Sequence, residues 1–191
     1  MSTPYLREDD RVGIRRLDAA DRAAFLTAAR ASTSLHHPWL LAPTTEAEFD
    51  ATLAACDRRT KEGLLVCDRQ TGDLAGWVNI NNIIRGRFQC GSLGYGAFLP
   101  YAGKGYLRAG LALVIQFAFA DLDLHRLEAN IQPGNTASIN LVRRLGFRHE
   151  GFSPDMLFID GAWRDHERFA ILSSAPQPPD LSPPSGTDPD R

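Results

Sequence analysis

A strand-like segment, a glycine turn and a long amphipathic helix follow one another without a break in residues 92–122, and this run most restricts the folds open to the chain. In residues 106–122 large apolar side chains recur every three or four positions, which predicts a helix with one buried face. Residues 92–99 have the composition of a strand, and Gly103 and Gly105 supply the turn between the two. A strand that turns directly into such a helix predicts an α/β domain in which the helix packs against a sheet.

The rest of the chain up to residue 172 alternates strand-like and helix-like segments. Helices are expected to begin at Asp18, at Thr45, where Glu48 completes a capping box, and at Asn135. Asp160 and Gly161 form a hairpin turn signal, so the domain is expected to end in an antiparallel hairpin. We therefore predict an α/β (α+β) fold with a mixed, mostly antiparallel central sheet flanked by about four helices. The expected strands cover residues 12–17, 62–67, 74–84, 92–99, 126–131, 156–159 and 162–172.

The composition of the chain changes sharply at residue 173. Six of the twelve prolines lie in residues 173–191, where Leu181 is the one large aliphatic residue. So little apolar surface cannot offset the entropy lost on ordering. The sequence predicts a single domain in residues 1–172 and a disordered proline-rich tail in residues 173–191.

Composition excludes several classes of protein. Lys and Arg number 21 and Asp and Glu 23, which gives no electrostatic reason to expect binding to nucleic acid or to an anionic membrane. The three cysteines are widely spaced and lack a CxxC pair, so we expect reduced thiols and no metal site. The polar N-terminus lacks the apolar core of a signal peptide, and no segment is long and apolar enough to span a membrane. These features predict a cytoplasmic protein.

The turn around Gly103 and Gly105 has two interpretations. A helix that begins at a glycine turn presents free backbone N–H groups and the positive end of its dipole, an arrangement suited to phosphate. Alternatively, the glycines only satisfy the geometry of a tight connection. The turn matches neither the Walker A pattern, because Gly105 follows Lys104 where Ser or Thr is required, nor the GxGxxG pattern, because Arg108 stands where the last glycine is required. Neither ATP nor NAD is therefore supported.

Two segments together resemble a known family. The turn YAGKGY before LRAGLALVIQFAF, followed by LHRLEANIQPGNTASINLVRRLGFRHEG, is similar to the acetyl-CoA core of the GNAT N-acetyltransferase superfamily. Asn82 to Phe88 and the closing LFIDGAWRDH resemble its RimJ/RimL branch, with RimJ the more similar, and this branch acetylates the N-terminal amines of ribosomal proteins. The resemblance implies the GNAT acyl-CoA N-acyltransferase fold, acetyl-CoA as cofactor, and direct transfer of acetyl to an amine.

The resemblance also implies where acetyl-CoA binds. The family's pyrophosphate turn matches here only at its middle glycine, Gly105, while Ala102 and Leu107 depart from the pattern. The phosphate ligands of such a turn are mostly main-chain N–H groups, and Lys104 can add a cation. The strand before the turn is expected to splay from its neighbour so that its backbone pairs with pantetheine. The residues expected to bind the cofactor are Ala97, Phe98, Leu99, Ala102, Gly103, Lys104, Gly105, Tyr106, Leu107, Asn130, Asn135 and Ser138.

Two residues are candidates for the proton transfers. Ser138 matches the serine that, in the RimL type, donates a proton to the leaving thiolate, and Asn135 and Ser138 can equally be a helix N-cap and its N3 partner. Glu128 is a candidate base acting through water, or else a strand residue paired with a neighbouring arginine. Asp155 is a weaker candidate base. An N-terminal amine, with a pKa near 7.7 to 8.0, needs little help to become nucleophilic.

Further residues are candidates for binding the acceptor. His36, His37 and Trp39 lie between the first two expected helices, where GNAT proteins build one wall of the acceptor groove, although paired histidines beside Pro-Trp more often have only a structural role in a loop. Arg85 and Tyr95 are further candidates, and Arg85 can also be a solvated cation at a strand end.

Three functions remain open on the sequence. The favoured one is acetylation of the N-terminal α-amine of a protein, such as a ribosomal protein. The second is acetylation of a small-molecule amine such as an antibiotic, an amino acid or a polyamine. The third is a non-catalytic module that binds acetyl-CoA and regulates a partner. The chain is expected to be a monomer or a homodimer.

Overall fold

Eight strands form one mixed sheet in the order β1-β2-β3-β4-β5-β6-β8-β7. All neighbours are antiparallel except β5 and β6, which are parallel. The structure, a computed structural model, describes residues 4–174, so the predicted tail lies outside the described residues except for Ser173 and Ser174. The strands are β1 (Arg7–Glu8), β2 (Val12–Arg16), β3 (Glu62–Asp68), β4 (Leu74–Ile84), β5 (Cys90–Ala97), β6 (Arg126–Ile131), β7 (Arg148–Ile159) and β8 (Ala162–Leu172).

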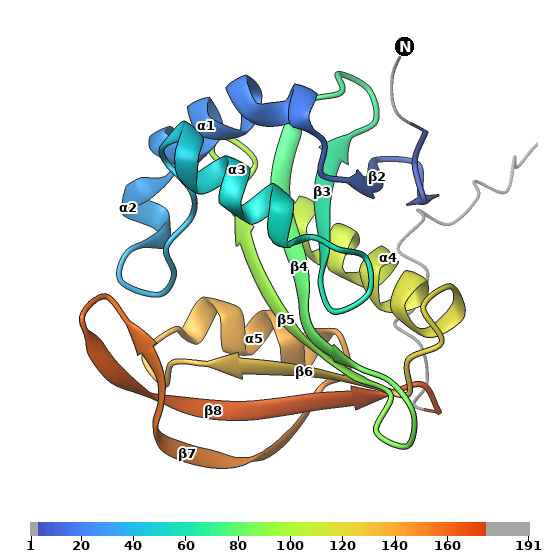
Figure 1. Ribbon diagram of the computed structural model, residues 1–191, viewed down its shortest axis with the longest axis vertical. Helices are drawn as coiled ribbons and strands as arrows, with labels where there is room; N and C mark the ends of the chain where they lie inside the picture. The colour runs from blue at the N-terminus through green and yellow to red at the C-terminus, as the bar shows by residue number, and fades with distance from the viewer. Residues whose placement is uncertain (1–3, 175–191) are drawn as a thin grey trace, which may run out of the picture.

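Helices cover both faces of the sheet (Figure 1). Alternate residues of β3 separate two cores: Leu64 and Val66 pack with α4 and α5, while Leu65 and Cys67 pack with α1 and α3. This alternation follows from the two-residue repeat of a strand and explains why β3 is apolar on both faces. The helices are the 3₁₀ turn η1 (Ala19–Asp21), α1 (Arg22–Ala31), α2 (Thr33–His36), α3 (Glu46–Ala55), α4 (Tyr106–Ala120) and α5 (Thr136–Arg144).

The mixed α/β fold is confirmed, and several local signals act as expected. The capping box of Thr45 and Glu48 forms at the start of α3. Gly146 follows α5 with φ of 88°, and the N–H of Phe147 bonds back to the carbonyl of Val142 at 3.1 Å, as in a glycine C-cap. The Asp160-Gly161 turn has positive φ at both residues, and it joins β7 to β8.

Other details differ from the expectation. The capping box of Asp18 and Asp21 starts a 3₁₀ turn rather than the helix itself, and the buried residues of α1 are Phe25, Leu26 and Ala29. Strand β7 begins at Arg148, eight residues earlier than expected, because its first half is polar and exposed and so lacks an alternating pattern. Short elements β1 and α2 were not expected.

The central feature of the sheet is the separation of β5 from β6. The two strands pair over three positions, from Cys90 opposite Arg126 to Ser92 opposite Glu128. Beyond Ser92, β5 pairs with β4 on its other side, and β6 beyond Glu128 pairs with β8. Figure 1 shows the two halves of the sheet meeting at one end and opening toward the other. The divergence leaves a wedge in the middle of the sheet.

Features of membrane-spanning proteins and of metalloproteins are missing from the described residues. Within residues 4–174 no helix is long and apolar enough to cross a membrane. In the same residues there is no group of His, Cys, Asp and Glu side chains that could hold a metal ion. Cys67 and Cys90 are buried free thiols, and Cys56 is half-buried and free.

Candidate active site

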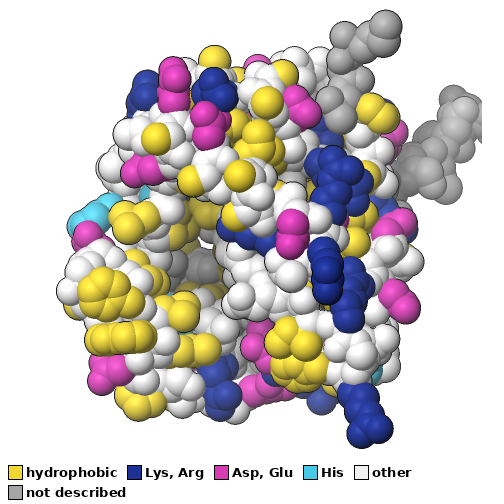
Figure 2. Space-filling view, in the orientation of Figure 1, with side chains coloured by type: hydrophobic (Ala, Val, Ile, Leu, Met, Phe, Trp, Pro, Cys, Tyr) yellow, Lys and Arg dark blue, Asp and Glu magenta, His cyan; other side chains and the backbone are white. Residues whose placement is uncertain are grey.

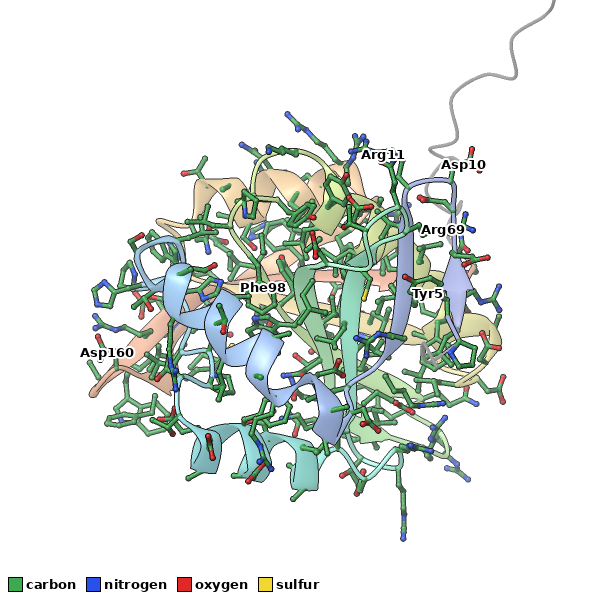
Figure 3. The ribbon with its side chains drawn as sticks, turned by 90° about the horizontal axis from the view of Figure 1, so that it is seen from above. Tyr5, Asp10, Arg11, Arg69, Phe98 and Asp160 are labelled. Carbon is green, nitrogen blue, oxygen red and sulfur yellow. The ribbon has the colours of Figure 1, made fainter. Side chains whose placement is uncertain are left out.

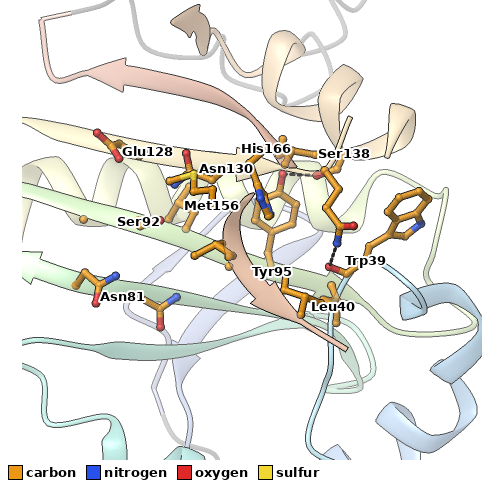
Figure 4. A pocket seen from close by; sticks show the side chains of 18 of the residues that line it. Trp39, Leu40, Asn81, Ser92, Tyr95, Glu128, Asn130, Ser138, Met156 and His166 are labelled. Atoms are coloured by element: carbon orange, nitrogen blue, oxygen red, sulfur yellow. Dashed lines mark hydrogen bonds between the residues drawn. The ribbon is translucent and has the colours of Figure 1, made fainter. Parts of the chain in front are cut away.

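A pocket of about 610 Å³ occupies the wedge between β5 and β6. The space-filling view shows the surface hollowed between the two halves of the molecule (Figure 2), and the close-up shows polar side chains entering the pocket from several elements (Figure 4). The wall is mostly apolar, with Glu128 the one charged side chain among the described residues that line it. The other lining residues that enter the argument are Trp39, Ser92, Tyr95, Asn130, Gln132, Asn135, Ser138, Met156, Leu157 and His166.

One edge of β5 has free backbone groups that face the wedge. The N–H of Phe98 bonds to Ala75 of β4, so the carbonyl of Ala97 in the same peptide unit points the opposite way. His36 Nε2 lies 2.8 Å from this carbonyl oxygen. By the alternation of a strand, the N–H and carbonyl groups of Tyr95 also point into the wedge. The Ala97 carbonyl is thus engaged by His36, whereas the Tyr95 groups lie beyond the last β5–β6 pair and can pair with the amides of a ligand.

The two arms of the wedge are joined by a hydrogen bond between hydroxyl groups. The Tyr95 hydroxyl on β5 and Ser138 Oγ in the first turn of α5 lie 2.6 Å apart. Burial raises the pKa of Tyr95 to about 12, and the bond to Ser138 lowers it only in part. Tyr95 is therefore protonated at neutral pH and can donate to Ser138, which leaves the Ser138 proton available to a group in the pocket.

Two asparagines lie on the α5 side of the pocket. Asn135 caps α5, accepting a hydrogen bond from the N–H of Ser138 at 3.1 Å, so the capping interpretation of this pair is confirmed. Asn130 Oδ1, on β6, is buried and has no hydrogen-bond partner within the described residues. An unpaired buried acceptor in a pocket is costly unless a ligand donor reaches it. Asn130 therefore fits a ligand that carries an amide N–H.

Glu128 lines the pocket but already has a partner. Its Oε1 accepts a hydrogen bond from Arg126 Nε at 2.8 Å, and the same guanidinium binds Glu150 through its other two nitrogens. Glu128 thus lines the pocket and is paired with a neighbouring arginine, as the second interpretation of this residue predicts. One oxygen is engaged, which limits Glu128 as a direct proton acceptor.

The glycine turn leads from β5 into α4, as the sequence indicates. Gly103 and Gly105 have φ of 75° and 86°, and a Cβ added at either would meet no atom within 4 Å. The first helical bond runs from Ala109 to Gly105, so the N–H groups of residues 106–108 have no acceptor inside the helix. Lys104 is exposed beside them. This is a suitable site for an anionic group.

Side chains next to β2 and at the end of β3 contact the glycine turn and hold it in place. Arg11 donates to the carbonyl of Lys104 at 3.3 Å and lies over the Tyr106 ring, whose hydroxyl donates to Asp68 at 2.9 Å. A second pocket lies here and is lined by Arg11, Tyr106 and Arg69, among others. Figure 3 shows Arg11 and Arg69 on the side of the molecule away from Asp160.

A loop and a hairpin border the pocket. The loop after α2 carries Trp39, whose carbonyl accepts a hydrogen bond from Gln132 at 3.1 Å. The neighbouring His37 lies 3.4 Å from Asp160 at the tip of the β7–β8 hairpin. Two segments distant in sequence are thus joined at the rim.

The structure separates the predicted acceptor residues. Trp39 and Tyr95 line the pocket, whereas His36, His37 and Arg85 do not. His36 is buried and bonds to β5, and burial lowers its pKa, with the bond to Ala97 acting in the opposite direction. Arg85 donates to the carbonyl of Leu122, near the end of α4.

The predicted cofactor residues also divide into two groups. Phe98 is fully buried in the core beside α1, and the Leu99 N–H donates to Ser32 Oγ at 3.0 Å. The Ala102 N–H bonds to the carbonyl of Phe98, and Leu107 packs toward Gly76. These residues shape the turn, while the N-terminus of α4, Asn130, Asn135 and Ser138 present polar groups that a ligand could meet.

Comparison with known proteins identifies the family to which this fold and pocket belong. A family profile described as "Acetyltransferase (GNAT) domain" matches residues 11–148. The chain belongs to the GNAT acetyltransferase family. The resemblance of its turn and following helix to this family is therefore confirmed.

Relatives of the RimJ and RimL types are among the similar GNAT proteins. The [Ribosomal protein uS5]-alanine N-acetyltransferase of Escherichia coli is 36% identical over 116 residues, which cover 61% of this chain and 57% of that enzyme. The chain thus spans little more than half the length of the curated relatives it matches first.

Solved structures match over more of the chain. Mycobacterium smegmatis RimJ in complex with CoA-disulfide has a TM-score of 0.76 and 26% identity, covering 85% of this chain and 82% of that one. The Vibrio fischeri ribosomal-protein-S5-alanine acetyltransferase has a TM-score of 0.78 and 25% identity, covering 88% and 96%. A spermidine N-acetyltransferase from Vibrio cholerae, at 20% identity and a TM-score of 0.73, shares the fold.

Several pocket residues were not predicted from the sequence as site residues. Met156 and Leu157 of β7 and His166 of β8 line the wall opposite β5. They come from the last hairpin, which reaches the wedge only through the pairing of β8 with β6. The available signal was the LFIDGAWRDH segment, which includes Leu157 and His166 but does not show which side chains point into the pocket.

Proposed function

We propose that this GNAT protein transfers the acetyl group of acetyl-CoA to the N-terminal α-amine of a protein. The observation that carries the proposal is the pocket at the β5–β6 divergence, whose one charged lining side chain, Glu128, is already paired with Arg126. A polyamine or an aminoglycoside carries several positive charges and would need several carboxylates. An open, mostly apolar groove with a single carboxylate, itself paired with an arginine, suits a peptide end that carries one amine.

The residues present fit acetyl-CoA. The free N–H groups at the start of α4 suit a pyrophosphate, the free edge of β5 suits the amides of pantetheine, and the orphan oxygen of Asn130 suits an amide N–H. When bound, acetyl-CoA supplies the acetyl group as a reactive thioester. Backbone N–H groups on the edge of β5 would donate to the thioester oxygen, where negative charge develops during transfer.

Ser138 and Tyr95 are assigned to the leaving group. Ser138 Oγ donates its proton to the sulfur, and the Tyr95 hydroxyl donates to Ser138 and so favours that transfer. The high pKa of Tyr95, about 12, keeps this donor protonated throughout the neutral range. Trp39, on the loop after α2, forms part of the acceptor side of the pocket.

The experiment measures release of the CoA thiol and the mass of the product for a panel of amines. Short peptides that begin with Ala, Ser or Met are compared with the same peptides blocked at the α-amine and carrying an internal lysine, and with polyamines, amino acids and amine antibiotics. Because the Escherichia coli relative is named for alanine, the Ala-first peptide leads the panel. Acetylation confined to free α-amines is the expected result.

Other outcomes assign other functions. Turnover of a small amine in preference to every peptide would refute the peptide assignment and make the protein a metabolite or drug acetyltransferase. Binding of acetyl-CoA without any acetylated product would refute catalysis and leave a regulatory module.

A further inference from the structure

His166 lies in the pocket with no partner on one of its ring nitrogens. It is on β8, is 2% exposed and lines the wall together with Tyr95 and Ser138 (Figure 4). Its Nδ1 lies 2.8 Å from the carbonyl oxygen of Arg164. Within the described residues its Nε2 makes no hydrogen bond.

The contact with Arg164 fixes the tautomer of the ring. A carbonyl oxygen only accepts hydrogen bonds, so Nδ1 must carry the hydrogen that it donates. In a neutral imidazole the other nitrogen is then unprotonated. His166 therefore has a lone pair at Nε2, and nothing in the described structure occupies it.

The other four histidines do not combine burial, a place in the pocket lining and a free ring nitrogen. His37 and His149 each face a carboxylate, and both are exposed. His125 is exposed beside a serine hydroxyl. His36 is buried, but its Nε2 is engaged by a backbone carbonyl of β5 and it does not line the pocket. Of the five histidines in the sequence, His166 is the one that is buried, faces the pocket and keeps a free ring nitrogen.

Few titratable or charged groups lie around His166. Cys90 and Tyr95 of β5 and Glu128 of β6 are the other titratable groups that line the pocket, while the residues from α5 and β7 that line it carry no titratable group. Along β8 the alternate positions on either side are Arg164 and Arg168. In the described structure no carboxylate bonds to the ring, whose one hydrogen-bond partner is the Arg164 carbonyl.

We propose that His166 is the general base that takes the proton from the acceptor ammonium group; this inference rests on the proposed acetyl transfer. Nε2 accepts one proton from the ammonium, which gives the amine its lone pair. That lone pair forms the new C–N bond as the C–S bond breaks, and the sulfur leaves with the bonding electrons. After the attack the nitrogen loses its second proton to solvent, and Ser138, which has given its proton to the sulfur, regains one from solvent. The proton on His166 passes to solvent, so each turnover releases one proton.

The choice of His166 as the base also agrees with the contacts of Glu128, the other candidate in the pocket. One of its oxygens is engaged by Arg126, and no other carboxylate lines the pocket among the described residues. Imidazole is the side chain that most often serves as general base in enzymes, and Nε2 of His166 offers its lone pair inside the pocket.

The test separates the basic nitrogen from the structural bond. His166→Asn keeps an N–H donor in reach of the Arg164 carbonyl but has no basic nitrogen. His149→Asn is the matched control, because His149 lies on the neighbouring strand β7, outside the pocket lining. We expect His166→Asn to lower kcat/KM for the best amine of the panel by about 100-fold or more, with CoA affinity unchanged. His149→Asn should leave kcat/KM unchanged.

The pH dependence of kcat/KM distinguishes a general base from a residue with only a structural role. In wild type the acidic limb of kcat/KM should reflect the protonation of His166 as well as that of the amine, whereas in His166→Asn it should follow the amine alone. Retention of kcat/KM within about threefold, with the wild-type profile, overturns the inference. Absence of turnover by wild type with every amine overturns the proposed function as well, which distinguishes the two failures.

A second measurement uses the wild-type chain and needs no variant. Ring-nitrogen NMR of the protein bound to CoA at pH 7.5 should show His166 with Nδ1 protonated and Nε2 free. A spectrum in which Nε2 carries the proton overturns the inference even if the Asn variant fails to fold.

Discussion

Gly105 offers the sharpest test of the anion site at the start of α4. The residue is the N-cap of α4 with φ of 86° and ψ of −7°, a left-handed conformation that side chains with a Cβ rarely adopt. A Cβ placed there meets no atom within 4 Å, so the cost of Gly105→Ala is backbone strain rather than a clash. That strain is about 1–2 kcal/mol. For a domain of this size it corresponds to a fall in Tm of about 2–8 °C.

Gly105→Ala should weaken CoA binding by more than the backbone strain alone would. If the backbone relaxes out of the left-handed region, the N–H groups that open α4 turn away from the pyrophosphate. One hydrogen bond to a charged group contributes about 1.5–3 kcal/mol, so its loss should weaken CoA binding by about 10- to 100-fold. Isothermal titration calorimetry with CoA measures this directly.

Gly86 provides the matched control. It has φ of 74°, also faces open space, and lies in the turn between β4 and β5, at the other end of β5 from α4. Gly86→Ala should lose similar stability with CoA affinity unchanged. If Gly105→Ala binds CoA as tightly as Gly86→Ala does, the N-terminus of α4 is not the pyrophosphate site and the reasoning fails.

Two further predictions concern other residues of the site. Ser138→Ala should lower kcat by about 100-fold with CoA affinity unchanged, since it removes the proton donor to the leaving sulfur, and steady-state kinetics that show no change in kcat would remove Ser138 from that role. Burial lowers the pKa of His36 in the folded state below its ordinary 6.5, so the folded protein binds fewer protons than the unfolded chain and the neutral ring stabilises the fold above about pH 6.5. The free energy of unfolding should therefore fall as the pH is lowered through 6.5, and denaturant titrations at pH 7.5 and 5.5 should show a smaller fall for His36→Gln; equal falls would contradict the assignment.

Much of the fold could be predicted because its signals are local. The bounds of β4, β6 and β8 match the expected strands, since each has a distinct apolar pattern ended by a turn. The glycine turn and the apolar face of α4 are also determined by nearby residues. The start of α1 and the length of β7 were wrong because a 3₁₀ turn and an exposed polar strand leave little trace in the pattern.

The site was less predictable because its walls come from distant segments. Asn130 and Ser138 were expected to bind the cofactor, Glu128 to act in proton transfer and Tyr95 to bind the acceptor, and all four line the pocket. His36 and Arg85 lie elsewhere because each finds a backbone carbonyl from a distant part of the chain, at Ala97 and Leu122. The approach of β8 through its pairing with β6 cannot be derived from the residues around His166.

The divergence of β5 from β6 gives the sheet two interior edges in addition to its two outer ones. Any strand edge with free N–H and carbonyl groups is a template on which another chain can pair, which is a route to aggregation. Here the edges lie in a recess whose rim includes the loop after α2 and the tip of the β7–β8 hairpin, joined through His37 and Asp160. Because the two interior edges face each other across the pocket, a strand of another molecule could pair with them only by entering the wedge between β5 and β6. Backbone groups that an outer edge would present to any neighbouring chain are here presented to a ligand inside the sheet.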